Sequence, residues 1–186
     1  MMFLLFISVI IIQRIMELII ARKNEKWMKQ QGGVEYGQNH YPYMVAMHSL
    51  FFVALLVEVF AFNHQLSAWW PMLLSLFLLT QAVRIWALSS LGKYWNTKII
   101  VLPNTSIVKK GPYKYLRHPN YTIVALEIVL IPMLFGAYLT AVTFTLLNIL
   151  ILSVRIPLEE KALMNETDYM EKFKEISRFP TPIKKT

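Results

Sequence analysis

Two apolar runs decide the fold class: YTIVALEIVLIPMLF (121–135) and LTAVTFTLLNILILSV (139–154), joined by the short segment GAY (136–138). Glu127 is the only charged residue in this stretch. A membrane-spanning helix needs about 20 mostly apolar residues, so each run lies near the short limit and suits a tilted helix or a locally thin bilayer. Gly136 predicts a tight turn between the runs. The stretch therefore predicts a helical hairpin in a membrane.

Three further apolar runs lie toward the N-terminus, at 2–21, 43–62 and 70–91. Hydrophobic residues make up 56% of the 186 residues and charged residues only 16%, unlike an average soluble domain. We therefore predict an all-α integral membrane protein with about five transmembrane helices. The first run meets a basic segment, so no cleavable signal peptide is expected. One membrane domain is predicted, in which 1–91 carries three helices and 92–186 carries a long loop, the hairpin and a helical tail.

Lys and Arg are distributed unevenly among the connecting segments. The segments 63–69 and 136–138 contain neither residue, whereas 22–41, 92–120 and the tail after 154 contain nearly all of the 19. Basic segments tend to remain on the cytoplasmic side of a membrane, so the N-terminus is expected outside and the tail in the cytoplasm. The sequence thus predicts a multi-pass protein of the cell membrane, in contact with membrane lipid.

The tail is charged and helix-prone, and a separate cytoplasmic helix is expected from 157 to about 176. Pro157 suits the first turn of such a helix, and the glutamates that follow it suit the positive end of the helix dipole. Pro180 and Pro182 are expected to stop any helix. Three apolar residues of the tail recur at helical spacing and can pack on the inner face of the membrane domain: Leu163, Met170 and Phe173.

Several classes of function are disfavoured by composition. The net charge of +8 can indicate nucleic acid, but in a membrane protein a basic cytoplasmic face is the usual reason, so no nucleic acid partner is expected. The chain has no cysteine, which excludes disulfides and thiolate chemistry. Its four histidines show no metal-ligand spacing, and there is no phosphate-binding or dinucleotide-binding glycine motif. No metal site is therefore expected.

The segment GPYKYLRHPNY (111–121) is the most unusual part of the sequence. Pro119 disfavours helical geometry at His118 and can open the helix that follows, which places Tyr121 in the first turn. Free backbone N–H groups at such a helix start form an anion site that could hold the carboxylate of an amino-acid-like cofactor. The alternative is a basic, aromatic anchor at the membrane interface, and the pattern alone does not separate the two.

A second group of charged residues is Arg155-x-x-x-Glu159-Glu160, at the predicted cytoplasmic end of the fifth span. Arg155 and Glu159 are one turn apart and can form an ion pair. In a functional role, glutamate can accept hydrogen bonds from ribose hydroxyls or an amino group, and arginine can hold an oxyanion with two N–H groups. Without other information, a plain charge cluster at a helix end is the favoured interpretation.

A few ionisable residues lie within the predicted spans, where charge is costly and usually faces a partner or a cavity. Arg14 and Glu17 are spaced as partners on one helix, and Glu58 stands in apolar surroundings. Glu127 is either a general base or a buried partner for Arg84. We favour the structural role.

Taken together, these segments resemble the isoprenylcysteine carboxyl methyltransferase family, in particular its bacterial branch. The resemblance rests on the Gly-Pro-Tyr-x-Tyr-x-Arg-His-Pro-Asn-Tyr segment, the short hairpin, and Arg-x-x-x-Glu-Glu-x-x-Leu at 155–163. It covers the chain from residue 91 onwards. The Arg-His-Pro-x-Tyr element alone is shared with related membrane methyltransferases and sterol reductases, but the combination at this spacing is fairly specific.

The resemblance implies an enzyme that uses S-adenosyl-L-methionine, lacks a Rossmann domain, and holds the cofactor in a cytoplasmic pocket reached by a lateral lipid tunnel. The catalytic residues would be Arg155, facing the acceptor, and Arg117, ordering the junction. The amino-acid end of the cofactor would be held by His118, Pro119, Asn120 and Tyr121. The other cofactor-binding positions implied are Lys98, Thr105, Ser106, Ile107, Val108, Tyr113, Glu159 and Glu160.

The acceptor is less defined than the cofactor. Eukaryotic members of the family methylate prenylated cysteine carboxylates, whereas a bacterial relative is expected to O-methylate a lipophilic small molecule such as a long-chain pyrone or phenol. A carboxylate needs no base, an enol or phenol can ionise with help from Arg155, and an alcohol needs a base that the sequence does not identify. The alternatives are an NADPH-dependent membrane reductase of the sterol-reductase type and a membrane scaffold or transporter.

Overall fold

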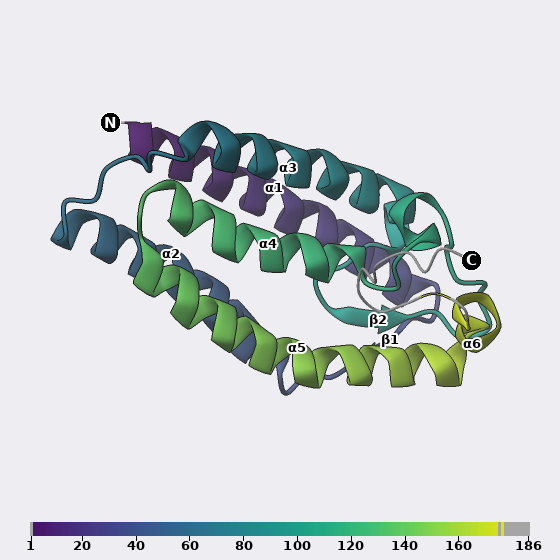
Figure 1. Cartoon of the computed structure of the whole chain (residues 1–186). Helices are drawn as coiled ribbons and strands as arrows, with labels where there is room; N and C mark the ends of the chain where they lie inside the picture. The colour runs from purple at the N-terminus through teal and green to yellow at the C-terminus, as the bar shows by residue number, and fades with distance from the viewer. Residues whose placement is uncertain (1, 175, 177–186) are drawn as a thin grey trace.

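The computed structural model of the protein describes residues 2–174 and 176 and consists mainly of helices (Figure 1). Five long helices run back and forth, so that the loops 31–40 and 92–118 lie at one end, together with the last helix. The elements are, in chain order, α1 (Met2–Gln30), β1 (Val34–Tyr36), α2 (Tyr41–Ala61), α3 (Trp70–Leu91), the 3-10 turn η1 (Gly92–Tyr94), β2 (Ile99–Val101), the 3-10 turn η2 (Gly111–Lys114), α4 (Pro119–Leu134), α5 (Tyr138–Glu166) and α6 (Tyr169–Phe173).

The helices have the length and surface of a membrane bundle, which confirms the predicted fold class. Within the described residues, four helices are long and apolar enough to cross a membrane: α1, α2, α3 together with η1, and α5. The fourth helix, α4, has 16 residues and is shorter, as its apolar run suggested. Large apolar side chains such as Leu5, Ile85 and Leu139 are exposed on the outside of the bundle, where a lipid environment removes the cost of exposure.

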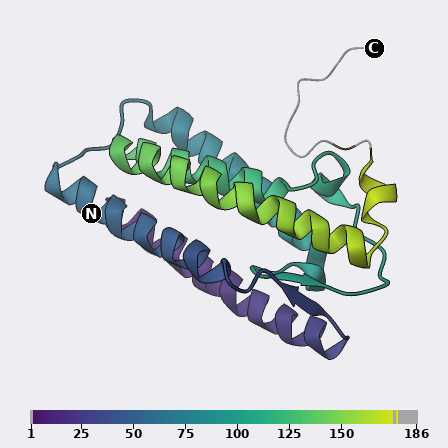
Figure 2. The ribbon, with the colours of Figure 1, turned by 90° about the horizontal axis from the view of Figure 1, so that it is seen from below.

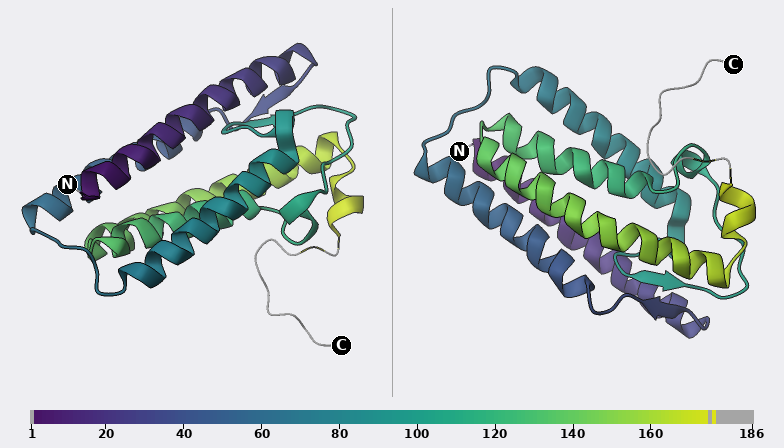
Figure 3. Two further views of the ribbon diagram at one scale, coloured as in Figure 1. Left: turned by 90° about the horizontal axis from the view of Figure 1, so that it is seen from above. Right: turned by 60° about the horizontal axis from the view of Figure 1, so that its bottom comes forward.

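The helices form two layers, α1 with α2 and α3 with α4 and α5 (Figures 2 and 3). The layers meet tightly near the end that holds the chain start, where aromatic side chains interlock. The rings of Phe51 on α2 and Phe144 on α5 lie 5.5 Å apart, and those of Phe3 and Phe135 lie 4.8 Å apart. At the other end the layers are bridged by the strands and loops, and this arrangement positions the site described below.

The predicted hairpin is present, with α4 and α5 joined at Gly136, whose φ of +69° favours glycine. Glu58 of α2 caps the N-terminus of α5. Its carboxylate accepts hydrogen bonds from the backbone N–H groups of Leu139 and Thr140, at 3.0 and 2.6 Å. An acceptor at this position satisfies N–H groups that have no partner within the helix, so the charge of Glu58 has a structural explanation.

Two helices are longer than predicted. The first continues from residue 21 to Gln30, because the basic segment after the apolar run consists of good helix formers and no glycine occurs before Gly32. The helix α5 runs without interruption to Glu166 and contains Pro157 in its interior, where a separate tail helix was expected. Strong helix formers follow that proline and outweigh the lost backbone hydrogen bond. The last span and most of the tail are therefore one element.

The strands β1 and β2 were not predicted. They pair antiparallel, with Val34 opposite Val101, Glu35 opposite Ile100 and Tyr36 opposite Ile99. Three residues are too few to produce a recognisable alternating pattern, so the sequence carried little signal for them. Their effect is to join the loop before α2 to the loop after α3 at one end of the bundle (Figure 2).

The end of the tail agrees only partly with expectation. Tyr169 and Phe173 of α6 are buried, and Leu163 packs beside them. Met170, in contrast, has 56% of its surface exposed and does not join that contact, because the short helix α6 starts a new direction after α5 ends. The predicted stop at Pro180 and Pro182 lies outside the described residues.

Candidate active site

The junction at the start of α4 has the predicted geometry. The helix begins at Pro119, and His118 before it has φ −128° and ψ 59°, which is not helical. His118 and Tyr121 stack, with ring centroids 5.3 Å apart. The imidazole Nε2 lies 3.1 Å from the carboxylate of Glu160 on α5. The junction is thus fixed in place by a residue 42 positions further along the chain.

Arg155 and Glu159 do not form the direct ion pair suggested by their spacing. Instead, Tyr121 lies between them: Arg155 Nε donates to the Tyr121 hydroxyl at 2.7 Å, and that hydroxyl donates to Glu159. The guanidinium of Arg155 also lies 5.6 Å from the centre of the Tyr121 ring. The two charged segments that the sequence singled out separately are therefore parts of one hydrogen-bonded group.

Two further contacts hold Arg155, and neither was foreseen. Its Nη2 donates to the backbone carbonyl of Thr97 at 2.6 Å, and its Nη1 lies 3.5 Å from Nε2 of His40. Burial and the nearby guanidinium lower the pKa of His40, which favours the neutral, accepting imidazole. Of the five guanidinium N–H groups, one on each terminal nitrogen has no partner among the described residues. These two N–H groups can bind an oxyanion.

Glu160 and Arg117 lie behind the junction. Glu160 is only 1% exposed and receives hydrogen bonds from His118 and, at 3.3 Å, from the hydroxyl of Tyr169. Arg117 donates through Nε to the carbonyl of Ile176 at 2.5 Å and lies 6.0 Å from the Tyr169 ring centre. These contacts connect the junction to the tail. The hydrogen bond between His118 Nε2 and the Glu160 carboxylate fixes the position of the imidazole ring.

The loop 105–108 is attached to α6 by Asp168. The carboxylate accepts from the backbone N–H of Ile107 at 2.8 Å and from the hydroxyl of Ser106 at 2.7 Å. Lys172, one turn further on, donates to the same hydroxyl and to the Ile107 carbonyl. The hydrogen bonds from Ile107 and Ser106 lower the pKa of Asp168 to about 2. Asp168 was not predicted, because its partners lie about 60 residues earlier in the chain.

This attachment is expected to weaken in acid. The pKa of Asp168 is lower in the folded protein than in the unfolded chain, so its stabilisation is complete above pH 4 and is lost as the pH falls through about 2. Pepsin cleavage of the loop 103–110 should increase several-fold from pH 4 to pH 2. Asp168→Asn, which does not titrate, should show high cleavage already at pH 4. Equal cleavage of both proteins throughout would contradict the assignment.

Lys98 lies at the edge of the site and has acidic partners. Its ammonium lies 2.8 Å from Glu25 and 3.3 Å from Glu35, and 5.7 Å from the ring centre of Tyr41. The carboxylates raise the pKa of Lys98, so it remains charged. Because Glu25 is on α1 and Glu35 on β1, Lys98 joins three segments of the chain at this end of the bundle.

A cavity of about 430 Å³ runs through this region. It begins among the loops and α6 and continues between the two helix layers, where apolar side chains of α2 and α5 line it. Pro119 and Glu160 are not part of its lining. The predicted residues that line it are Lys98, Thr105, Ser106, Ile107, Val108, Tyr113, Arg117, His118, Asn120, Tyr121, Arg155 and Glu159.

The loop end of the cavity has the polar groups that S-adenosylmethionine would require. Among the described residues, Asn120 Oδ1 is a buried acceptor and Trp95 Nε1 a buried donor without hydrogen-bond partners, and both residues line the cavity. An ammonium, amine or hydroxyl of the cofactor would satisfy the first and its carboxylate or a ring nitrogen the second. The residues present therefore fit this cofactor. Within the described part of the chain, no group of three potential ligands could hold a metal ion.

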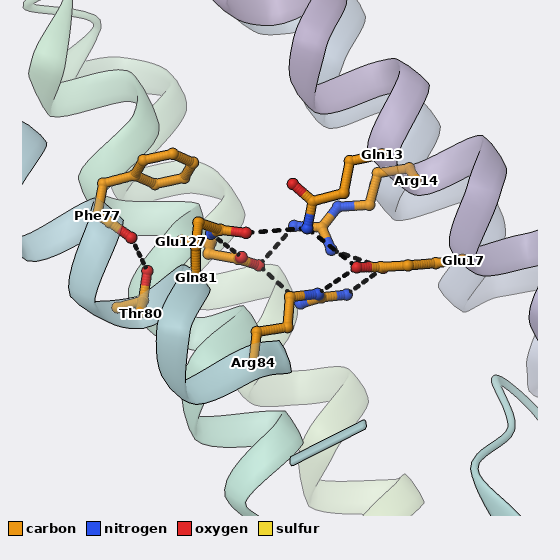
Figure 4. Close-up of polar contacts among 8 residues, drawn as sticks. All are labelled: Gln13, Arg14, Glu17, Phe77, Thr80, Gln81, Arg84 and Glu127. Atoms are coloured by element: carbon orange, nitrogen blue, oxygen red, sulfur yellow. Dashed lines mark hydrogen bonds and ion pairs between the residues drawn. The ribbon is translucent and has the colours of Figure 1, made fainter. Parts of the chain in front are cut away.

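Deeper in the bundle, the charged residues of three helices form a closed network (Figure 4). Arg84 of α3 donates to Glu17 of α1 at 2.6 Å and lies 3.0 Å from Glu127 of α4. Arg14 contacts both carboxylates, at 2.9 and 2.7 Å. The side chain of Gln81 donates to Glu127 at 2.6 Å. The predicted pairings of Glu127 with Arg84 and of Arg14 with Glu17 are confirmed, and two positive and two negative charges balance.

Comparisons with known proteins agree with this geometry. A sequence model of the isoprenylcysteine carboxyl methyltransferase family matches residues 72–165, which include both charged segments. The chain is 52% identical over 162 residues to the uncharacterized protein YpbQ of Bacillus subtilis, covering 87% of this chain and 96% of that protein. It is 28% identical over 165 residues to an uncharacterized protein of Haemophilus influenzae, covering 86% and 96%. No solved structure matches the chain significantly. The chain therefore belongs to the isoprenylcysteine carboxyl methyltransferase family of membrane methyltransferases.

Proposed function

We propose that the protein is an S-adenosylmethionine-dependent O-methyltransferase that acts on a lipophilic acceptor at the cytoplasmic face of the cell membrane. The observation that carries this proposal is a continuous cavity that starts at the polar junction and extends between apolar helices. Such a cavity can hold a polar donor at one end and a lipid chain at the other, with the reacting atoms between them. The family assignment supports the transfer of a methyl group.

The cofactor end is formed by the junction and the loop attached to α6. S-adenosylmethionine supplies a methyl group already activated by a sulfonium, so little acid–base chemistry is needed. His118 contacts Glu160 through Nε2. Its other ring nitrogen, Nδ1, has no hydrogen-bond partner among the described residues and can bind the cofactor. Asn120 offers its buried oxygen. Glu159 adds a negative charge near the donor. The loop 105–108 and α6 cover this end and limit the access of water, which favours transfer in a dry, ordered site.

The acceptor end is formed by Arg155. Its two available N–H groups can bind a carboxylate, or the oxyanion of an enol or phenol, and hold it in line with the methyl group. Tyr121, Thr97 and His40 fix the guanidinium, so its donors are oriented before the acceptor arrives. An acidic oxygen on a long-chain lipid, as in an alkylpyrone or a prenylated carboxylate, suits both the arginine and the apolar continuation of the cavity.

The proposed orientation follows from the distribution of basic residues. The loops and the tail at the site end carry nearly all Lys and Arg outside the spans, whereas the loop 62–69 and the turn at Gly136 carry none. This supports a cytoplasmic site and an N-terminus on the outside. A site on this side would have direct access to S-adenosylmethionine, which is made in the cytoplasm. The NADPH-dependent reductase considered from the sequence gains no support from the comparisons.

A ligand titration tests the proposed function. We expect S-adenosylhomocysteine to raise the thermal stability of the detergent-solubilised protein, by about 2.7 kcal/mol at one hundred times its dissociation constant. NADPH is expected to have no effect. His118→Ala and Glu159→Ala should each weaken the response to S-adenosylhomocysteine, whereas Lys161→Ala, an exposed position on the same helix as Glu159, should not. A response to NADPH alone would support the reductase, and no response to either ligand would refute the proposal.

A further inference from the structure

The cavity contains a second polar level within the membrane region. At the first level, Tyr41 of α2 and Arg155 of α5 both contact Thr97. Arg155 donates a hydrogen bond to the Thr97 carbonyl, and the hydroxyl groups of Tyr41 and Thr97 form a second hydrogen bond. Seven residues deeper on each helix lie His48 and Asn148, and both line the cavity. At about 1.5 Å per helical residue, the two levels are roughly 10 Å apart.

His48 and Asn148 lie at the same depth. Phe51 and Phe144 stack across the two antiparallel helices, with their ring centroids 5.5 Å apart. His48 is three residues before Phe51 on α2, and Asn148 is four residues after Phe144 on α5, so both lie one turn nearer to the loops than the aromatic pair. The cavity between this level and Arg155 is lined by apolar residues such as Met44 and Ile151.

Asn148 is a buried amide without a partner. Only 3% of its surface is exposed, and no hydrogen bond joins its side chain to any described residue. Its amide is not fully enclosed: a water-sized group can reach it from the cavity, where it needs a polar partner. Helix residues that contact lipid chains are normally apolar, so an asparagine that faces the cavity indicates a polar group in the ligand.

His48 supplies a hydrogen-bond acceptor at the same depth as the Asn148 amide. Its Nδ1 lies 2.8 Å from the Met44 carbonyl, which can only accept, so Nδ1 carries the proton and Nε2 is an acceptor. Nε2 has no partner among the described residues. A hydroxyl group can donate to this nitrogen and accept from the Asn148 amide. A carbonyl could satisfy only the amide, and an alkyl chain neither. The ion-pair network also lines this cavity, through Arg14, Glu17, Arg84 and Glu127, and each of its charged groups is bonded to one of opposite charge.

We propose that the acceptor carries a hydroxyl group on its chain, about 10 Å from the oxygen that is methylated, and that His48 and Asn148 bind it. This inference rests on the proposed function, since it takes Arg155 as the site of methylation. It defines the substrate class more closely: a long-chain lipid with an acidic oxygen at one end and a chain hydroxyl at a fixed distance from it.

Two probes test this inference: a long-chain alkylphenol and its counterpart with one chain hydroxyl placed about 10 Å from the phenol oxygen. Binding of each probe is measured by thermal stability in the presence of S-adenosylhomocysteine, and turnover is measured separately. The wild-type protein should bind the hydroxylated probe about tenfold more tightly, as expected for one or two buried hydrogen bonds. Asn148→Leu and His48→Leu should each remove most of this preference.

Thr143→Leu provides the matched control, because Thr143 is exposed on the outside of α5 near Asn148. This variant should keep the preference. Equal binding of both probes by the wild type, or an unchanged preference in Asn148→Leu, would overturn this inference. A response to S-adenosylhomocysteine in the same experiment would leave the proposed function intact. A preference for the hydroxylated probe without methylation of either phenol would support the subsite and count against the function. The thermal midpoint without ligand reports whether each variant folds.

Discussion

Arg155→Ala is expected to lower the turnover number for methyl transfer by about 100- to 1000-fold. This is the typical cost of removing one oriented hydrogen-bond donor to a reacting oxyanion. Binding of S-adenosylhomocysteine should change less than turnover, because Arg155 reaches the proposed cofactor residues only through the Tyr121 hydroxyl, and Tyr121 keeps its hydrogen bond to Glu159 and its stacking on His118. Single-turnover methylation of a long-chain phenol and the thermal response to S-adenosylhomocysteine measure the two effects separately.

Arg155→Lys sharpens this experiment. Lysine keeps the charge but cannot replace the planar set of donors that contacts Tyr121 and Thr97 and still offers two N–H groups. We expect this variant to recover only a small part of the lost turnover. Full activity in Arg155→Lys would mean that charge alone is required. Loss of S-adenosylhomocysteine binding in Arg155→Ala would show instead that the arginine organises the cofactor end.

Glu127→Gln is expected to reduce the free energy of unfolding by about 3–5 kcal/mol, the usual cost of leaving a buried charge without its partner. Arg84 is only 5% exposed and would keep Glu17, but one positive charge of the network would remain uncompensated (Figure 4). Unfolding by a denaturing detergent, followed by tryptophan fluorescence, measures the effect in mixed micelles.

The double variant Arg84→Leu, Glu127→Leu is the control for charge balance. It removes one charge of each sign and leaves Arg14 paired with Glu17, so we expect much of the stability to return. A loss below about 1 kcal/mol in Glu127→Gln would mean that solvent screens the network, as it does for exposed ion pairs. Loss of methylation at unchanged stability would instead favour Glu127 as a general base, the alternative that the sequence left open.

Several features of the fold could be predicted because they depend on local chemistry. Long apolar runs require a lipid environment wherever they occur, which indicated the fold class and the hairpin at Gly136. Pro119 has no backbone N–H to donate and disfavours helical geometry at His118, and α4 does begin at this proline, two residues before the apolar run. Charge within apolar helices requires a partner, which led to the pairing of Glu127 with Arg84.

Other features depend on residues far apart in the chain and were missed or wrong. The strands β1 and β2 are three residues each, and their pairing brings the loop before α2 to the loop after α3. The continuity of α5 through Pro157 was missed, because the local rule for proline was given more weight than the helix formers around it. Asp168, His40 and Trp95 join the site only through tertiary contacts, and no motif marks them.

For this protein, the sequence by itself determined which segments form apolar helices, which proline opens the fourth helix, and which residues carry charge, since each of these follows from a side chain and its near neighbours. Only the tertiary structure decided how the charges are used. Spacing along a helix suggested that Arg155 pairs with Glu159, but Tyr121 from another helix separates them and leaves two N–H groups of the arginine available. The physical reason is that a hydrogen-bonding group bonds to the partner nearest in space, and helix packing sets that partner.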